Sequence, residues 1–295
     1  MKTQGLTVRA AVISHIGCVR TNNEDNFYMD GQLMQQAQMD KGAWIELEKD
    51  APEHLFAICD GMGGLNGGEF ASAMGVQALA KLDGTLKSEV QRSLLAFVKR
   101  ISQAVYEDGQ SRNEQGREGT TLALLHLRNG VATVANVGDS RVYMLRLGKL
   151  VQLSRDHTLV FSKMLQGKLT REEMRKDPTG NQIYQYLGQE AGKITDDSMY
   201  YRECALCNGD RFMLCSDGVS DLIPHEQLEK LLTTSETPGE AANALVRTAL
   251  ELGGKDNTTC MVGDICAPGL PFATVADVSA LDLFAASATT QDTTL

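Results

Sequence analysis

The stretch Leu55-Phe56-Ala57-Ile58-Cys59-Asp60-Gly61-Met62-Gly63-Gly64 places a carboxylate directly after a short apolar run. An apolar run of this length, closed by glycines, predicts a buried β-strand that ends in a turn. The glycine after Asp60 lets the backbone approach a ligand closely. By itself, however, an Asp-Gly pair predicts only a turn, because both residues are common in turns.

Three other acidic motifs lie at the ends of strand-like runs. Asp217 follows the apolar run 212–215, and Asp256 precedes the run 258–262. The third, Arg20-Thr21-Asn22-Asn23-Glu24-Asp25, adds two carboxylates and an arginine. Carboxylates gathered at strand ends repel one another unless a cation lies among them, and Mg²⁺ and Mn²⁺ prefer oxygen ligands. Together the motifs predict a metal centre.

In this order the motifs resemble those of the metal-dependent protein phosphatase (PPM) family, the type 2C serine/threonine phosphatases, and of its bacterial members in particular. The resemblance extends from about Val8 to Ile265, and three further motifs fit it: Gly138-Asp139-Ser140-Arg141, Gly119-Thr120-Thr121 and Arg155-Asp156-His157-Thr158. It implies a phosphatase that acts on phosphoserine and phosphothreonine proteins. It also implies an opposing cytoplasmic Ser/Thr kinase.

The resemblance implies two Mn²⁺ or Mg²⁺ ions and a protein ligand set for them. Asp60 would bridge the two metals, and the carbonyl of Gly61 would bind one of them. Asp217 and Asp256 would complete the shell of the other. Catalysis would then use a water activated by two metals that clamp an in-line displacement.

Other residues take supporting roles by the same resemblance. Glu24 and Asp25 would act through metal-bound waters, and Asp139 would hold a third, weaker ion together with Asp217. Arg20 would bind the substrate phosphate with its planar guanidinium. The alternatives are a solvated or Asp-paired arginine for Arg20 and a turn-capping role for Asp139.

The identity of the general acid stays open at this stage. Eukaryotic relatives often carry a histidine where this chain has Met62, and methionine cannot donate a proton. A metal-bound water is one alternative donor. His157 and His54 are others, although a lone histidine is more often structural.

Composition excludes several classes of function. The formal charge of −10 argues against nucleic acid, whose phosphates need lysine and arginine to neutralise them, and it disfavours a metal-dependent nuclease. No cysteine lies six residues before an arginine, as a cysteine phosphatase would require. A catalytically inactive phosphoprotein-binding module would lack a metal aspartate, whereas Asp60, Asp217 and Asp256 are all present.

Several sequence features predict a cytoplasmic monomer that does not cross a membrane. No apolar segment is long enough to span a bilayer, and the first residues lack the apolar core of a signal peptide. The seven cysteines are an odd number and lie mostly inside apolar runs, which favours reduced, buried thiols over a disulfide framework. The CxxC pair Cys204 and Cys207 has no second CxxC to complete a zinc site.

Hydrophobic periodicity predicts an α+β protein with one domain over residues 1–266. Long antiparallel strand runs and grouped helices suggest two packed sheets, and the resemblance sharpens this to a four-layer α-β-β-α sandwich with the metals at one end. The Asn129-Gly130 pair predicts a tight hairpin. We expect strands near 8–16, 26–29, 55–59, 121–127, 131–137, 141–146, 150–153, 211–215 and 258–265, and helices near 69–82, 90–106 and 241–252.

Three segments depart from the compact family pattern. Residues 31–53, which contain Trp44, are predicted to form an insertion, most simply an extended surface hairpin. Residues 155–187 are mixed and polar, and we expect a mobile flap beside the site. The low-complexity tail 267–295 is expected to be loosely packed or disordered, with Leu281-Asp282-Leu283-Phe284 as a segment that could dock.

Overall fold

The computed structural model describes residues 5–39, 42–63, 67–112, 118–180, 182–190 and 192–281. Two expectations extend outside this range. Gly64 of the first motif is not described, and neither are residues 282–284 of the predicted docking segment. The expected loose packing of the tail therefore concerns the structure only up to Leu281.

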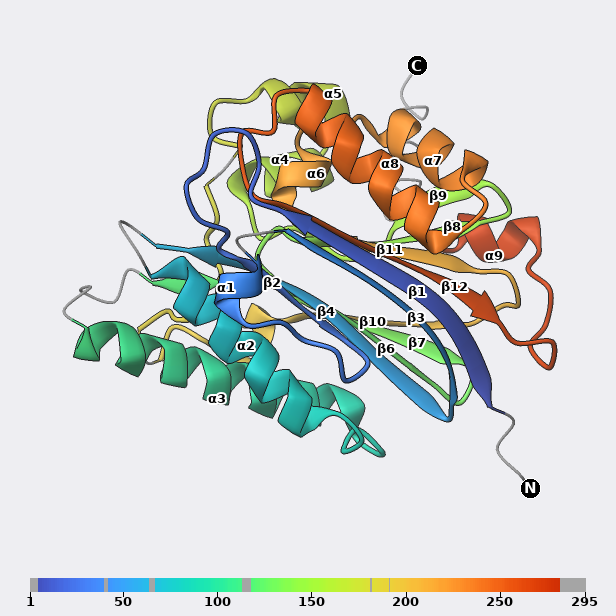
Figure 1. Cartoon of the computed structure of the whole chain (residues 1–295), viewed down its shortest axis with the longest axis horizontal. Helices are drawn as coiled ribbons and strands as arrows, with labels where there is room; N and C mark the ends of the chain where they lie inside the picture. The colour runs from blue at the N-terminus through green and yellow to red at the C-terminus, as the bar shows by residue number, and fades with distance from the viewer. Residues whose placement is uncertain are drawn as a thin grey trace, which may run out of the picture.

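The described residues form two antiparallel sheets that pack face to face (Figure 1). The first sheet has the order β3-β1-β12-β11-β8-β9 and the second the order β10-β7-β6-β4-β2, with β5 paired to β4. The strands of the first sheet are β3 (Ala43–Ala51), β1 (Leu6–His15), β12 (Thr258–Cys266), β11 (Arg211–Cys215), β8 (Arg141–Arg146) and β9 (Lys149–Gln152). Those of the second are β10 (Tyr200–Ala205), β7 (Val131–Val137), β6 (Leu122–Arg128), β4 (Glu53–Met62), β2 (Asp25–Met29) and β5 (Gly119–Thr120).

Helices cover the outer face of each sheet. The helices α2 (Gly68–Leu82) and α3 (Val90–Ser111) lie against the second sheet, while α7 (His225–Thr234) and α8 (Pro238–Glu251) lie against the first (Figure 1). This arrangement confirms the predicted four-layer α-β-β-α sandwich. The shorter helices are α1 (Gln36–Met39), α4 (Leu159–Leu165), α5 (Arg171–Lys176), a 3₁₀ turn (Asp196–Ser198), α6 (Asp217–Ser220) and α9 (Val275–Ser279).

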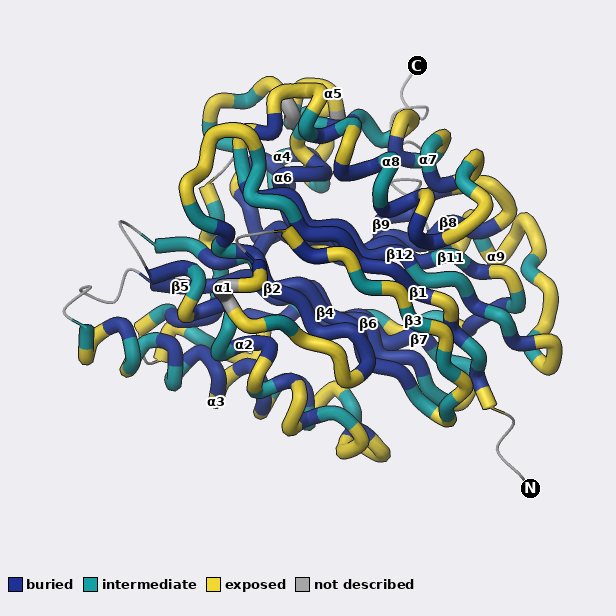
Figure 2. Tube along the Cα trace, viewed as in Figure 1, coloured by how far each residue is buried: buried dark blue, intermediate teal, exposed yellow. Residues whose placement is uncertain are grey.

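Three apolar clusters correspond to the three interfaces between these layers. The cluster between the sheets includes Val12, Phe27 and Phe212, and one outer cluster joins α2 and α3 to the second sheet. The other joins α7 and α8 to the first sheet. Figure 2 shows the central strands buried along most of their length, because they are covered on both faces, whereas the edge strands β3 and β10 are partly exposed. Burial on both faces explains why β2, β6 and β8 read as continuous apolar or mixed runs rather than alternating ones.

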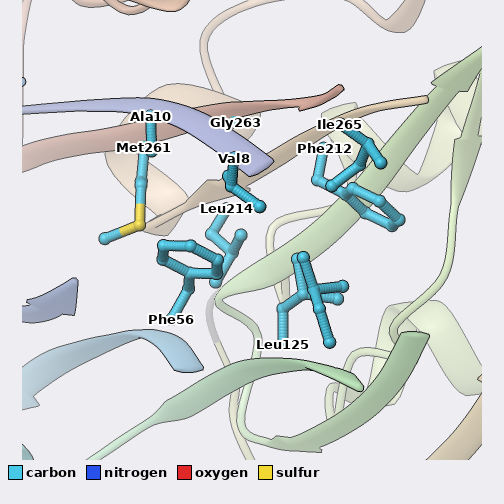
Figure 3. Close-up of a pocket in the computed structure, with 10 residues that line it drawn as sticks. Val8, Ala10, Phe56, Leu125, Phe212, Leu214, Met261, Gly263 and Ile265 are labelled. Atoms are coloured by element: carbon cyan, nitrogen blue, oxygen red, sulfur yellow. The ribbon is translucent and has the colours of Figure 1, made fainter. Parts of the chain in front are cut away.

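A small apolar gap remains between the sheets, lined by side chains that include Val8, Phe56 and Leu214 (Figure 3). It offers a water-sized sphere only about 10 Å³, which is near the minimum for one water. Gly263 lies on its wall, where a side-chain methyl group would sit 3.7 Å from Val8 and 3.8 Å from Ala10. Without polar partners for a water, the gap is expected to stay dry.

The predicted hairpin at Asn129-Gly130 is confirmed. Both residues have positive φ, 52° and 74°, as a two-residue turn between antiparallel strands requires. It joins β6 to β7, which pair in register from Leu122↔Val137 to Arg128↔Val131. The predicted strands and helices are present, with ends shifted by a few residues.

The interpretation of residues 31–53 as a surface hairpin was wrong. Residues 43–51 form β3, which pairs with β1 over its whole length in the first sheet, whereas β4 belongs to the second sheet. The chain therefore crosses between sheets at Pro52 instead of turning back on itself. The alternation of Ile45 and Leu47 with Glu46 and Glu48 explains this placement, because it gives β3 one face for the core.

Part of the C-terminal tail is packed onto the sandwich. Leu281 is buried in the cluster between the sheets, and its carbonyl oxygen accepts a hydrogen bond of 2.7 Å from the Arg202 guanidinium. Residues 268–280 are exposed or partly exposed, as the expected loose packing states, and Leu281 is docked, as the sequence allowed. The seven cysteines are free thiols, and no helix in the described ranges is long and apolar enough to cross a membrane.

Candidate active site

Asp25 and Asp60 lie directly opposite each other at one end of the second sheet. The β2–β4 register pairs Asp25 with Asp60; Asp25 is buried, and Asp60 is partly exposed. The backbone of Asp60 is fixed by two neighbouring threonines: its N–H donates to the Thr121 hydroxyl at 2.9 Å, and its C=O accepts from the Thr120 hydroxyl at 3.0 Å. Strand pairing therefore brings together carboxylates that lie far apart in sequence.

Asp217 reaches the same end from the first sheet. It follows β11 at the start of α6, and Ser216 beside it donates a hydrogen bond of 2.8 Å to Asp25 Oδ2. Thr259 on β12 donates to the same oxygen at 2.6 Å. These two hydroxyls join the sheets beneath the carboxylates and hold the orientation of Asp25.

Asp256 lies just before β12, where Asn257 organises the loop. The Asn257 carboxamide accepts from Glu24 N–H and donates to the carbonyl oxygens of Ile16 and Asn22, at 2.8, 2.9 and 2.9 Å. One side chain thus ties the loop that carries Glu24 to the loop that carries Asp256.

Asp139 occupies the turn between β7 and β8 and is buried. Its neighbour Arg141 donates from Nε to Asp156 Oδ2 at 2.8 Å, and its Nη2 lies 2.6 Å from the same oxygen. This buried ion pair joins the Asp139 turn to the base of the 155–187 segment. His157 adds a second connection, because its Nδ1 accepts from Gly138 N–H at 3.1 Å.

Arg20 pairs with Asp256 in this structure. Its Nη2 lies 2.7 Å from Asp256 Oδ2, and the two side chains are 49% and 37% exposed. The alternative of an arginine paired with an aspartate therefore describes the ligand-free arrangement. The guanidinium remains close enough to solvent to meet an incoming anion.

The carboxylates of the site raise one another's pKa. Burial is the main cause for Asp60, followed by the charges of Asp25, Asp217, Asp139 and Asp256, and its pKa stands well above the usual range. Asp25 and the other predicted metal-ligating aspartates thus all act on Asp60. The pKa of Asp217 is raised well above normal for the same reasons, burial first.

The surrounding carboxylates show the same pattern. Burial raises the pKa of Glu24 to about 7 and that of Asp139 to about 7. The pKa of Asp25 rises only to about 6, because hydrogen bonds from Thr259 and Ser216 oppose the effect of its burial. Acidic groups that resist ionisation in a metal-free cluster become favourable ligands once cations enter.

Gly61 fits its expected place because no side chain can be accommodated there. A methyl group on Gly61 would come within 2.1 Å of the Gly68 carbonyl oxygen and 2.6 Å of the Glu24 carbonyl oxygen. The backbone at Gly61 is therefore packed directly against the segment that bears Glu24. The glycine leaves the carboxylates of the site unobstructed.

The residues present fit a divalent metal centre. Asp25 Oδ1 and Asp139 Oδ1 are buried oxygens without a hydrogen-bond partner, and anionic oxygens of this kind are the ligands that Mg²⁺ and Mn²⁺ prefer. Within the described ranges, no group of three or more acidic, histidine or cysteine side chains is placed so that it could hold a metal ion in the ligand-free arrangement.

Several residues that shape the site carry no obvious sequence signal. Ser14, Asn23, Ser216 and Thr259 form a buried hydrogen-bonded chain under Asp25. Their small polar side chains read as ordinary strand or turn residues. Only the presence of two hydroxyl residues beside aspartate motifs could have indicated a supporting role.

The two histidines considered as proton donors are differently placed. His54 is buried between Asp30 and the Leu6 carbonyl oxygen, 2.9 and 2.6 Å away, at the opposite end of β4 from Asp60. It cannot reach the site. His157 lies beside the Asp139 turn, but burial lowers its pKa to about 4, so it is neutral near pH 7 and carries no ready proton.

The structure is thus a two-sheet sandwich in which carboxylates, the ligands that hard divalent cations prefer, meet at one end of both sheets. A family model described as "Protein phosphatase 2C" matches residues 14–160. Protein phosphatase PhpP of Streptococcus pneumoniae is 30% identical over 255 residues, which is 84% of this chain and 94% of that protein. The chain belongs to the protein phosphatase 2C family, also called PPM.

A mycobacterial relative provides the structural comparison. Serine/threonine protein phosphatase PstP of Mycobacterium tuberculosis is 32% identical over 261 residues, 88% of this chain, but this chain spans only 45% of PstP's length. The crystal structure of PstP at 1.95 Å superimposes with a TM-score of 0.73 over 88% of this chain and 99% of the crystallised one. A second PstP structure, of the catalytic domain, contains 2 manganese ions.

Proposed function

We propose that this protein is a metal-dependent serine/threonine phosphoprotein phosphatase that hydrolyses phosphoserine and phosphothreonine in proteins. The observation that carries the proposal is the meeting of carboxylates from both sheets: Asp60 lies opposite Asp25, and Asp25 is hydrogen-bonded to Ser216 and Thr259, which lie beside Asp217 and shortly after Asp256, respectively. Carboxylates gathered in this way suit a site for two cations. The relatives, named as serine/threonine phosphatases, support the same activity.

In this proposal Asp60, the Gly61 carbonyl, Asp217 and Asp256 hold two Mn²⁺ or Mg²⁺ ions. Bound there, the two ions would supply an activated water and neutralise charge on the phosphoryl group. Asp25, fixed by Ser216 and Thr259, and Glu24, fixed through its backbone by Asn257, would orient the waters of the shell. Glu24 is partly exposed at the start of β2, and Asp25 is buried beside it.

Arg20 would exchange partners during substrate binding. In the ligand-free structure its guanidinium is paired with Asp256, and this partly exposed pair is weak. A phosphate monoester would offer the planar guanidinium of Arg20 two oxygens, in place of the one Asp256 oxygen that it contacts here. Release from Arg20 would at the same time free Asp256 for its role as a ligand.

Asp139 is proposed to act in protonation of the leaving group, with Asp217 and a third, weakly held ion. Met62 offers no proton, and His157 is held neutral by burial. The buried Oδ1 of Asp139 has no hydrogen-bond partner, which leaves this oxygen free to act at the site. We further propose that the protein acts in the cytoplasm as a monomer and opposes a Ser/Thr kinase.

The test is hydrolysis of a phosphothreonine peptide and of p-nitrophenyl phosphate by chelated protein, with and without added Mn²⁺ or Mg²⁺. Activity should be lost in EDTA and return with either metal. Asp60→Asn should lower the rate at least about a hundredfold, the scale of losing a principal electrostatic group. Full activity in EDTA, or in Asp60→Asn, would overturn the proposal.

A substrate comparison isolates Asp139. Asp139→Ala should reduce turnover of the phosphothreonine peptide far more than that of p-nitrophenyl phosphate, whose phenolate needs no protonation. Equal losses on both substrates would argue against a role in leaving-group protonation. Arg20→Ala should mainly raise KM. Because the arginine is paired with Asp256 in the ligand-free structure, metal affinity in a calorimetric titration should not fall.

A further inference from the structure

β3 is an open edge strand that the site does not use. It pairs with β1 on one side, and in the described part of the chain no strand or loop forms a backbone ladder with its other side. Its nine residues contain no proline. A long, regular and unpaired edge is a template for an added strand.

The register of the sheet shows which backbone groups face this open edge. Ser216 N–H donates to the Thr259 carbonyl, so Thr259 directs its backbone toward β11 and its neighbour Cys260 directs its own toward β1. Cys260 pairs with Ile13, so the next residue of β1, Val12, faces β3 and pairs with Ile45. Following this alternation along β3, the N–H and C=O groups that face away from the sheet belong to Trp44, Glu46, Glu48 and Asp50.

The same four residues are the exposed residues of β3. Trp44, the only tryptophan, is 57% exposed, and the other three are acidic. Side chains on one face of an antiparallel pair lie opposite each other. An added strand should therefore place basic residues opposite Glu46, Glu48 and Asp50, and an apolar or cationic residue over Trp44.

The opposite face of β3 favours apolar residues in an added strand. Ile45 and Leu47 are only partly buried and pack against the core between the sheets, so an added strand would cover them with its alternate side chains. Lys49, on the same face, already has a partner, because its Nζ lies 3.1 Å from Asp30 Oδ2. A second copy of this chain is a poor occupant, since antiparallel β3–β3 pairing would oppose carboxylates to carboxylates.

The Trp44 end of β3 lies at the same end of the sandwich as the carboxylates. Trp44 is paired with Ile13, and the next residue, Ser14, is hydrogen-bonded to Thr259, which donates to Asp25. β3 runs away from that end, so an antiparallel added strand runs toward it (Figure 1). A segment bound on β3 would thus lead its C-terminal continuation to the rim of the active site.

We propose that the free edge of β3 binds an extended segment of the phosphoprotein substrate, in which basic and apolar residues alternate, as an added antiparallel strand. The phosphorylated residue would lie C-terminal to this segment. The identity of the partner as a substrate rests on the proposed phosphatase function. Binding at the edge does not, and it can be measured without catalysis.

The binding experiment uses a synthetic peptide of about seven residues that alternates lysine and valine, a length that matches the edge at about 3.3 Å per residue. Trp44, as the sole tryptophan, reports binding through its fluorescence in the full-length protein. Glu46→Lys/Glu48→Lys should weaken binding at least about tenfold, because like charges would face across the strands. Glu107→Lys/Asp197→Lys changes the net charge equally at exposed positions on α3 and the 3₁₀ turn, and should bind as the wild type does.

N-methylation of the peptide separates strand addition from general attraction between charges. Opposite Glu46 and Glu48, the lysine amides face β3 and the valine amides face solvent. Methylation of the lysine amides should abolish binding, while methylation of the valine amides should leave it intact. Equal binding of the two methylated peptides, or unchanged binding to Glu46→Lys/Glu48→Lys, would overturn the proposal.

A kinetic experiment connects the edge to substrate choice. A phosphothreonine peptide with the alternating segment placed upstream through a flexible linker should have a KM at least about tenfold lower than the same peptide without the segment, by local concentration. Glu46→Lys/Glu48→Lys should remove this difference without changing hydrolysis of p-nitrophenyl phosphate. If the wild type fails to hydrolyse p-nitrophenyl phosphate, the phosphatase proposal fails, and the binding experiment still decides the edge. If the KM is the same with and without the segment, the edge of β3 does not bind the substrate.

Discussion

The aspartates at the two ends of the sandwich have opposite electrostatic surroundings. β2, β11 and β12 each have an aspartate toward either end: Asp25 and Asp30, Asp217 and Asp210, and Asp256 and Asp264. At the far end every one of these carboxylates meets cationic or hydrogen-bonding partners. Asp210 receives the Arg146 guanidinium at 2.7 and 2.6 Å, Asp264 receives Arg211 at 2.6 and 2.9 Å, and Asp30 contacts Lys49 and His54.

At the catalytic end carboxylates outnumber cations. Arg20 and Arg141 are the basic residues beside them, and they are already paired with Asp256 and Asp156. The comparison shows that burial of aspartates is not in itself a sign of function. The functional end differs in its lack of positive charge, and the raised pKa values of Asp60 and Asp217 result in part from this lack.

The largest effect is expected from breaking a balanced pair. Asp210→Ala leaves Arg146 buried without its counter-charge, and loss of one partner of a buried pair typically costs about 3–5 kcal/mol of unfolding free energy. Urea denaturation of the metal-free protein measures it. The control is Arg146→Met/Asp210→Leu, which removes both charges and should cost much less. Equal losses in both variants would show that packing, and not charge balance, dominates that end.

The unbalanced end predicts an unusual pH dependence for metal-free protein. A carboxyl group with a raised folded-state pKa binds more protons folded than unfolded, so stability falls as pH rises from about 4 to about 7. For Asp139, with a pKa near 7, the loss over this range is of order 3 kcal/mol. Urea midpoints in EDTA should therefore decline less steeply with pH for Asp139→Asn than for wild type. Parallel curves would mean that Asp139 ionises normally.

Bound metal ions should compensate for the missing positive charge at the catalytic end. A ligand that binds only the folded protein at about a hundred times its dissociation constant adds about 2.7 kcal/mol. Mn²⁺ should thus raise the melting temperature of the wild type at about pH 7 by several degrees, and that of Asp60→Asn much less. A similar rise in Asp60→Asn would place the stabilising ion elsewhere. Calorimetry with Mg²⁺ in place of Mn²⁺ extends the same comparison.

The smallest effect concerns the apolar layer between the two ends. Gly263→Ala should fill part of the gap between the sheets and reduce the freedom of the unfolded chain, which together add about 0.5–1 kcal/mol. Gly218→Ala is the matched control, because its methyl group would come 2.0 Å from the Asn257 carbonyl oxygen. It should destabilise. Thermal unfolding of the two variants decides, and a destabilised Gly263→Ala would show that the gap cannot accept a methyl group.

Sequence reasoning predicted what depends on local pattern. The apolar runs that end at Asp60 and Asp217 gave the strands and the carboxylates, and Asn129-Gly130 gave a hairpin. The convergence of Asp60, Asp217 and Asp256 depended on the motif combination, since nothing in a single motif says which strands become neighbours.

Long-range pairing was the part that sequence could not supply. The alternating pattern at Ile45 and Leu47 was visible, but its sheet is decided by pairing with β1 and by the crossing at Pro52. β10 was not predicted because its mixed, partly exposed residues lack a clear period. The hydroxyls of Ser216 and Thr259 were missed for a similar reason, because their partner Asp25 is more than a hundred residues away.

The position of β12 has a consequence for the chain during its synthesis. Although β12 comes from the end of the catalytic region, it lies between β1 and β11 in the first sheet. The ribosome therefore releases β1 long before its central neighbour exists, and pairing at such a large sequence separation is slow. Thr259 and Asp256 arrive on that last strand and its preceding loop, so a nascent chain has no complete cluster of carboxylates. If the protein is the phosphatase proposed above, its activity would begin only after translation of this region is finished.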